Sequence, residues 1–167
     1  MYKTSVLWLC TLLWSVGLAV TPIPSRSPDK NNNVDCTGPI AFSSTGSTSV
    51  HSTGLVAFKQ NVVNLAVTWD REVGVFTCAC SGLYQFSFSG STEENTRLML
   101  KKRLNNGKQW TPIIATKPGG GSASILLEVE NGDQVAVYLD GNSKKFNTRH
   151  EQGIEVTSFS GYRIAKS

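Results

Sequence analysis

The 167-residue sequence lacks the repeats and long patterns that mark several protein classes. Glycine does not recur at every third position, which excludes a collagen triple helix, because only glycine fits at the axis of that helix. No stretch shows strong helical periodicity, and no apolar run after Val20 approaches the roughly 20 residues that a membrane-spanning helix needs. The Asn-x-Ser/Thr motif is also absent, so we do not expect N-glycosylation.

Catalytic motifs are equally scarce. His51 lies in a Ser/Thr-rich stretch and His150 in a basic one, and neither stands beside a Gly-x-Ser-x-Gly or Cys-His pattern. The glycines at 119–121 lack the Gly-Lys-Ser/Thr ending of a phosphate-binding loop. A zinc site at Cys78 and Cys80 would need a second pair of ligands nearby, and there is none. We therefore predict that the protein is not an enzyme, which disfavours a secreted hydrolase.

The charge balance is only mildly basic. The chain has 16 Lys and Arg residues against 12 Asp and Glu residues, a formal net charge of +4. A nucleic-acid-binding domain usually carries a much denser basic stripe. We therefore expect no nucleic-acid partner.

The N-terminal end has the pattern of a secretory signal peptide. A basic start at residues 1–3 is followed by an uncharged apolar run at residues 5–20, with small residues that permit cleavage after Ala19. The alternative is an uncleaved membrane anchor, but the run is short and Pro22 and Pro24 follow at once. We predict a signal peptide over residues 1–19, a secreted, extracellular protein and no membrane insertion.

The remaining chain divides into a leader and one domain. Residues 20–37 are rich in proline and asparagine and show no apolar period, which indicates a flexible leader. Residues 38–167 form a domain of ordinary size that can bury its own core.

The clearest strand pattern lies in the middle of this domain. Tyr84, Phe86 and Phe88 alternate with polar residues, so one face of the strand is aromatic and the other is polar. Residues 74–79 are also β-prone, and residues 81–82 supply a short connection. These two segments are predicted to form a hairpin.

Similar patterns continue to the end of the chain. Asn106-Gly107 predicts a tight hairpin turn of the primed type, while residues 45–54 predict a loop. Residues 135–139 have two partly apolar faces, with Ala136 and Tyr138 on the second, which indicates burial on both sides. Turn signals recur every eight to twelve residues or so, and roughly ten strands without a helix predict an all-β antiparallel sandwich.

A family resemblance rests on spaced aromatic and glycine positions. Without insertion or gap, the chain resembles the signature of the complement C1q globular head at Phe58, Asn64, Trp69, Phe76, Gly82, Tyr84, Phe86 and Phe88. Residues 41–43, 130–135 and 158–164 resemble the first strand, the late hairpin and the closing strand of that family. The resemblance therefore covers roughly residues 39–164.

This resemblance implies a ten-strand jelly roll, which is also similar to the tumour necrosis factor fold, and a homotrimer. Because no collagen repeat is present, assembly must use the head itself or a covalent link through Cys36. Tyr84, Tyr138 and Tyr162 are candidate trimer-interface residues, since aromatic surface beyond the needs of one core is stabilised by burial between subunits. The alternative is that all three are ordinary core residues.

The cysteines leave two alternatives. Cys10 is lost with the signal peptide, so Cys36, Cys78 and Cys80 remain in an oxidising compartment. Joining Cys78 to Cys80 would distort a strand. We prefer an interpretation in which Cys36 forms a disulfide between subunits and the other two are buried. The alternative is a link within the chain from Cys36 to Cys78 or Cys80.

The candidate ligand-binding residues are basic and fall on a predicted strand and in a late loop: Lys101, Arg103, Lys144, Lys145, Arg149 and His150. Such groups attract anionic sugars and bind them through forked hydrogen bonds, although a solvated surface has the same composition. Calcium is a lesser candidate ligand through Asp133, Asp140 and Asn142, and turn chemistry explains these residues equally well. We expect no other cofactor or metal.

Taken with the resemblance, these features predict a secreted, lectin-like recognition module of innate immunity. Its partners would be glycans, microbial surfaces or a cell-surface receptor. The alternative is a signalling ligand of the cerebellin or tumour-necrosis-factor type. In either case we expect binding through loops at residues 45–54, 89–95 and 140–153, because the fold constrains them least.

Overall fold

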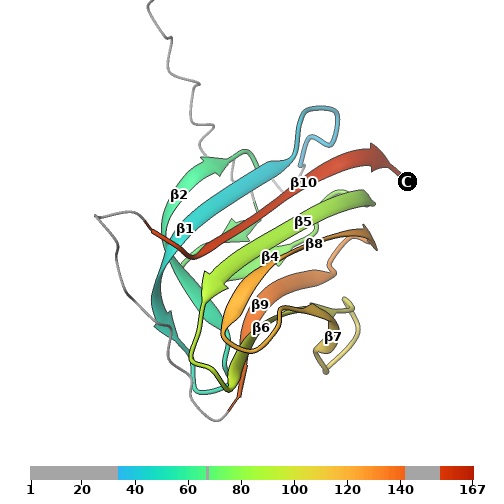
Figure 1. The fold of residues 1–167 in the computed structure, drawn as a ribbon. Coiled ribbons are helices and arrows are strands. Elements are labelled where there is room, and N and C mark those ends of the chain that lie inside the picture. Colours follow the sequence, from blue (N-terminus) through green and yellow to red (C-terminus); the bar gives the residue numbers. More distant parts are fainter. Residues whose placement is uncertain (1–33, 67, 142–154) are drawn as a thin grey trace, which may run out of the picture.

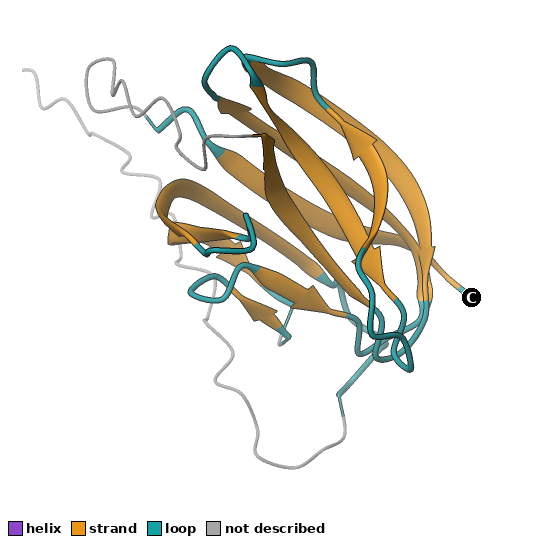
Figure 2. Cartoon of the chain, turned by 90° about the horizontal axis from the view of Figure 1, so that it is seen from below, coloured by secondary structure: helices purple, strands orange, loops and turns teal. Residues whose placement is uncertain are grey.

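The computed structural model describes residues 34–66, 68–141 and 155–167. These residues form ten β-strands and no helix (Figure 1). The strands make two five-stranded sheets that face each other as two layers (Figure 2). The predicted all-β antiparallel sandwich is therefore confirmed, and none of the described residues belongs to a helix that could cross a membrane.

Neighbouring strands within the two sheets pair in antiparallel fashion. The first sheet has the order β2 (Val56–Asn64), β1 (Ala41–Val50), β10 (Ser158–Lys166), β5 (Gly82–Ser91) and β8 (Gly120–Val129). The second has the order β3 (Trp69–Asp70), β4 (Val75–Thr77), β9 (Gln134–Gly141), β6 (Thr96–Arg103) and β7 (Thr111–Ala115). Several strands that follow each other in the sequence thus lie in different sheets, as in a jelly roll.

The predicted hairpin of residues 74–79 with the Tyr84 strand is wrong. β4 pairs with β3 and β9, whereas β5 pairs with β10 and β8 in the other sheet. The chain crosses between the sheets at residues 78–81, because the aromatic faces of both strands point into one core. The rings of Phe76 and Phe86 meet there at a centroid distance of 5.7 Å.

Two turn predictions also need correction. β6 and β7 pair as expected, but residues 104–110 connect them and Gly107 does not adopt the positive φ of a primed turn. Positive φ angles are required in two-residue primed turns, and the longer connection does not need them. Residues 45–50 are not a loop, because β1 continues there and pairs with β2 as far as the Val50–Val56 pair.

Aromatic side chains from both sheets fill the core. Phe42 stacks on Trp69 at a centroid distance of 4.4 Å, and Phe159 packs edge-on against Phe42 at 5.0 Å. The indole N–H of Trp69 donates to Ser44 Oγ at 2.8 Å, which satisfies a buried polar pair. This packing holds the two sheets together and turns their outer faces to opposite sides of the molecule.

The central strand β9 is buried on both faces, as predicted. Val135, Val137 and Leu139 belong to the core between the sheets. Ala136 and Tyr138 lie on the outer side, where they form a second apolar cluster with Val75, Leu55 and Trp110. A strand with no free face explains why its sequence is almost continuously apolar.

Candidate functional site

The outer face of the first sheet carries rows of hydroxyl side chains. Strand register aligns Thr45, Ser158, Ser89 and Ser122 across the sheet, and the next row is Ser43, Ser160, Ser87 and Ser124. We call these two rows the serine face. They arise because serines alternate with the core residues along β1, β5, β8 and β10.

Hydrogen bonds within the serine face satisfy many of its hydroxyl groups. The Oγ atoms of Ser87 and Ser124 lie 2.8 Å apart, and those of Ser89 and Ser158 lie 2.9 Å apart. Gln85 Nε2 donates to Ser124 Oγ at 3.1 Å. These internal partners lower the cost of removing the face from water.

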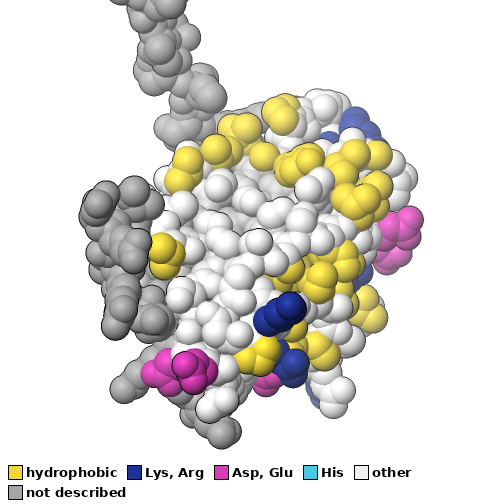
Figure 3. All heavy atoms as spheres, viewed as in Figure 1, with side chains coloured by type: hydrophobic (Ala, Val, Ile, Leu, Met, Phe, Trp, Pro, Cys, Tyr) yellow, Lys and Arg dark blue, Asp and Glu magenta, His cyan; other side chains and the backbone are white. Residues whose placement is uncertain are grey.

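The row of side chains next to the serine face carries no charge. The next row is Ala41, Tyr162, Gln85 and Leu126, in which Tyr162 and Leu126 are exposed. Figure 3 shows an uncharged centre on this side of the molecule, with hydrophobic side chains mainly above it and to its right and charged side chains along its lower edge. A shallow hollow of about 390 Å³ lies on the face, between β5, β8 and β10. Such a surface suits contact with another copy of a protein better than binding of an ion.

The three candidate interface tyrosines occupy different environments. Tyr84 is wrongly assigned to a subunit interface, because it is 1% exposed in the core and its hydroxyl donates to Cys80 O at 2.6 Å. Tyr138 is buried by its own chain, under Trp110 on the outer side of the second sheet. Burial raises the pKa of Tyr138 to about 12, although the charge of Arg103 opposes the shift. Tyr162 is 47% exposed and borders the serine face, so of the three tyrosines it remains a candidate interface residue.

Lys101 and Arg103 lie together on the outer side of the second sheet. Lys101 Nζ sits 4.4 Å from the ring centre of Tyr138, and Arg103 Cζ sits 5.0 Å from that of Trp110. The two rings contact each other at a centroid distance of 5.4 Å. We call these four residues the basic–aromatic cluster. Lys144, Lys145, Arg149 and His150 lie outside the described residues.

Lys102, between the two cations in the sequence, points the other way. Its Nζ is 2.8 Å from Asp133 Oδ2 and also donates to Glu128 O at 2.8 Å. Burial alone would raise the pKa of Asp133. The hydrogen bonds from Lys102 and from the backbone N–H groups of Glu130 and Asn105 outweigh burial and hold this pKa below its ordinary value. Lys102 and Asp133 thus form an inward structural pair.

The candidate calcium ligands among the described residues are each paired with a cation. Asp133 is paired with Lys102, and Asp140 Oδ2 accepts hydrogen bonds from Arg97 at 2.9 Å. Asn142 lies outside the described residues. In the ranges that the structure describes, no group of three or more His, Cys, Asp or Glu side chains is arranged to hold a metal ion.

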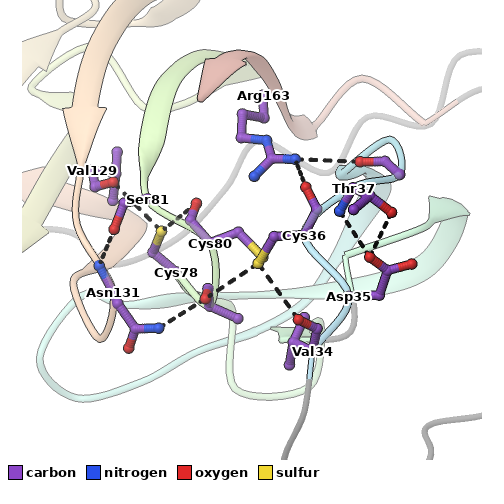
Figure 4. Close-up of a disulfide and its surroundings, with 12 residues drawn as sticks. Val34, Asp35, Cys36, Thr37, Cys78, Cys80, Ser81, Val129, Asn131 and Arg163 are labelled. Carbon is purple, nitrogen blue, oxygen red and sulfur yellow. Dashed lines mark hydrogen bonds between the residues drawn. A yellow bond between two sulfur atoms is a disulfide. The ribbon is translucent and has the colours of Figure 1, made fainter. Parts of the chain in front are cut away.

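The preferred prediction for Cys36, a bridge between subunits, is wrong, because Cys36 forms a disulfide with Cys80 of the same chain (Figure 4). The turn after β4 brings Cys80 close to the segment that precedes β1, with a Cα–Cα distance of 5.6 Å. Arg163 holds the same segment by donating to the carbonyl oxygens of Cys36 and Gly38. Cys78 is buried beside the disulfide, and burial raises the pKa of its thiol.

Sequence reasoning missed the two aromatic partners of the cations and the serine face. Trp110 lies near the start of β7, and only strand pairing brings it over β9. The serines carried a visible signal, because Ser87 and Ser89 alternate with Phe86 and Phe88 in the sequence. Their alignment with serines of other strands depends on register, which a single sequence does not reveal.

Comparison with known proteins gives a consistent family assignment. Residues 41–164 match the model of the C1q domain. The chain is 26% identical over 113 residues to one of the subunits of the complement C1q subcomponent of Rattus norvegicus, a match covering 66% of this chain. It spans only 44% of the length of that relative. Domains of this family are generally binding modules rather than enzymes.

Solved structures share the fold. The globular domain of the zebrafish complement 1qA protein matches with a TM-score of 0.58 at 19% identity, over 78% of this chain and all of that one. Murine APRIL at pH 8.5 matches with a TM-score of 0.55 at 10% identity, over 76% and 100% of the two chains. The Eiger TNF of S. frugiperda gives 0.53 at 12% identity, over 77% and 94%. These likenesses confirm the predicted C1q and TNF type of jelly roll.

Proposed function

This chain belongs to the C1q domain family, and from that premise we propose that it is a secreted, non-enzymatic recognition module. In this proposal it assembles as a homotrimer and binds glycans or other polymers on microbial or cell surfaces. Its role would be lectin-like pattern recognition in innate immunity. The predicted signal peptide at residues 1–19 supports secretion.

The observation that carries the proposal is the serine face. It spans four strands, has no charged side chain in its two rows and is bordered by exposed Tyr162 and Leu126. Burying an uncharged surface avoids the large cost of desolvating ions, and small side chains allow close approach of a second sheet. Three copies of the chain meeting through this face would direct their second sheets outward.

Trimer formation would also strengthen weak ligand contacts. A single group of basic side chains binds an anionic sugar weakly in water, because the charges are screened by salt. Three identical groups on one particle bind a polymer with higher avidity than one group. Lys101 and Arg103 together with the 142–154 segment, which contains Lys144 and Lys145, supply the candidate positive charges.

A glycan-array screen on the purified secreted protein tests the recognition role. We expect binding to a set of anionic glycans, and we expect Lys144→Ala with Lys145→Ala to weaken capture of bacterial cells or isolated surface polymer. The array includes neutral glycans as controls for nonspecific adsorption. Absence of binding to every glycan and every bacterial surface would refute this function.

The second candidate function is a signalling ligand that engages a receptor. Its support is the shared fold with murine APRIL and the Eiger TNF, which shows only a common architecture at these identities. Saturable binding to one host membrane protein, without glycan binding, would favour this alternative. Glycan or bacterial-surface binding that the Lys144 and Lys145 substitutions abolish would favour the first.

A further inference from the structure

We propose that the basic–aromatic cluster is a binding site for polysaccharides that carry sulfate or carboxylate groups. This inference rests on the proposed function and gives it a location and a ligand class. The site is on the outer face of the second sheet, opposite the serine face. Assembly through the serine face would therefore leave all copies of the cluster accessible to a long polymer.

The two cations of the cluster are not neutralised by nearby carboxylates. Across the described part of the chain, the ion pairs involve Lys59, Arg71, Arg97 and Lys102, and neither Lys101 nor Arg103 has a carboxylate within 4.0 Å. Arg97 on the same strand face is paired with Asp140. The outer side of β6 thus has one neutralised cation and two whose positive charge is available.

Contacts with the rings hold these charges in place without using up their hydrogen-bond donors. Arg103 lies over Trp110 and donates to the side-chain oxygen of Gln134, which is itself anchored to Thr77 Oγ1 at 3.2 Å. A guanidinium group has five N–H donors in one plane, so stacking on a ring leaves most of them free for an anion. Restraining the side chain beforehand reduces the entropy lost on binding.

The spacing and composition of the cluster favour a sugar chain. Successive outward positions of a strand are about 7 Å apart, so Lys101 and Arg103 can contact separate anionic groups along one extended polymer. Sugar rings present apolar C–H faces as well as polar groups, and the half-buried Trp110 provides apolar surface beside Arg103. The site therefore offers both kinds of contact.

An acidic peptide fits this surface less well. Extended peptides usually bind by adding a strand to the free edge of a sheet, where unpaired backbone groups are available. The cations project from β6, which pairs with β7 on one side and β9 on the other. A peptide lying over β6 would find no free backbone partners, whereas side groups of a polysaccharide need none.

The test measures Kd values for dextran sulfate, polygalacturonate and neutral dextran, with poly-glutamate as the peptide probe. We expect the wild-type protein to bind dextran sulfate or polygalacturonate and to bind neutral dextran and poly-glutamate at least about tenfold more weakly. Arg103→Gln and Lys101→Gln should each raise the Kd about tenfold or more, because a hydrogen bond to a charged group is lost. Arg97→Gln removes the same charge from the same strand but should change the Kd less than about threefold.

The same variants also provide a control for folding. Their results distinguish failure of this binding site from failure of the proposed function. Lys101 contacts Tyr138 on the outer face, away from the core between the sheets, so Lys101→Gln should keep the wild-type unfolding midpoint. The inference is overturned if both cluster variants bind like Arg97→Gln, or if poly-glutamate binds as tightly as the polysaccharides. Loss of binding only in the Lys144 and Lys145 variant would leave the proposed function standing without this site. No binding to any probe or arrayed glycan would remove both.

Discussion

Asp133 is a candidate calcium ligand by sequence, but in the structure it pairs with Lys102 and stabilises the fold. It is 3% exposed in the turn before β9 and accepts hydrogen bonds from Lys102 and from two backbone N–H groups. These donors stabilise the charged carboxylate against the cost of burial. The carboxylate therefore ties β6 to the turn between β8 and β9.

Asp133 makes stability depend on pH in acid. Its pKa in the folded state is below the ordinary value of 3.8, so the unfolded chain takes up the proton first as the pH falls. The stabilisation is present above that value and is lost as the pH falls through the lower, folded-state pKa. We expect Asp133→Asn to lower the free energy of unfolding at neutral pH by about 1–3 kcal/mol, and the difference from wild type to vanish in strong acid.

Urea unfolding at a fixed protein concentration from pH 7 to pH 2 measures this difference. Asp140→Asn is the matched control, because the Arg97–Asp140 pair is about half exposed and exposed pairs contribute little. A gap between wild type and Asp133→Asn that stays constant down to pH 2 would contradict the account.

The cysteines mark the limit of residue-scale prediction. Sequence spacing correctly excluded a bond between Cys78 and Cys80, since the two would have to close across a single intervening residue. It did not decide between a link within the chain and one between subunits. That choice depends on where the chain turns after β4, which is a property of the whole fold.

At the scale of the strand, the packing of β10 over the core requires glycine at position 161. Gly161 lies between β1 and β5 and faces the core, where a Cβ atom would come within 2.6 Å of Phe42 Cε1 and 2.7 Å of Phe86 Cδ1. Real Cβ atoms essentially never approach other atoms so closely. The absence of a side chain at Gly161 is therefore what lets the two rings fill the space under β10.

Gly161→Ala should destabilise the fold through overpacking. We expect a loss of about 1–3 kcal/mol in the free energy of unfolding, because the rings of Phe42 and Phe86 must move within a packed core. Ser160→Ala, the neighbouring change on the opposite face of the same strand, should cost less than about 0.5–1 kcal/mol. Thermal and urea unfolding of the two variants make the comparison, and equal stabilities would show that the core has room at Gly161.

Individual strands were easier to predict than their partners. The alternation of Tyr84, Phe86 and Phe88 correctly identified the buried face of β5, and the two apolar sides of β9 correctly indicated double burial. Both patterns report burial, which depends on side-chain period. The predicted hairpin of β4 with β5 is wrong. A short connection between two β-prone segments can join neighbouring strands of one sheet or strands of two different sheets, and the sequence pattern is the same in both cases.

At the scale of the molecule, the two outer faces differ in chemistry. The first sheet presents rows of uncharged hydroxyl groups, and the second presents charge held over aromatic rings. In the proposed assembly the first face is buried between subunits and the second faces the surroundings. Sequence composition suggested basic and aromatic surface, but only the pairing of the strands places the basic–aromatic cluster on one side of the molecule and the serine face on the other.

Sedimentation equilibrium of the purified protein, with and without a charge on the serine face, tests this account most directly. We predict a trimer for the wild type and a folded monomer for Ser87→Arg, because Ser87 is central to the face and a buried arginine would have no partner there. Thr111→Arg on the edge strand β7 of the second sheet is the control and should remain a trimer. A wild-type protein that stays monomeric, or a Ser87→Arg protein that stays trimeric, would contradict it.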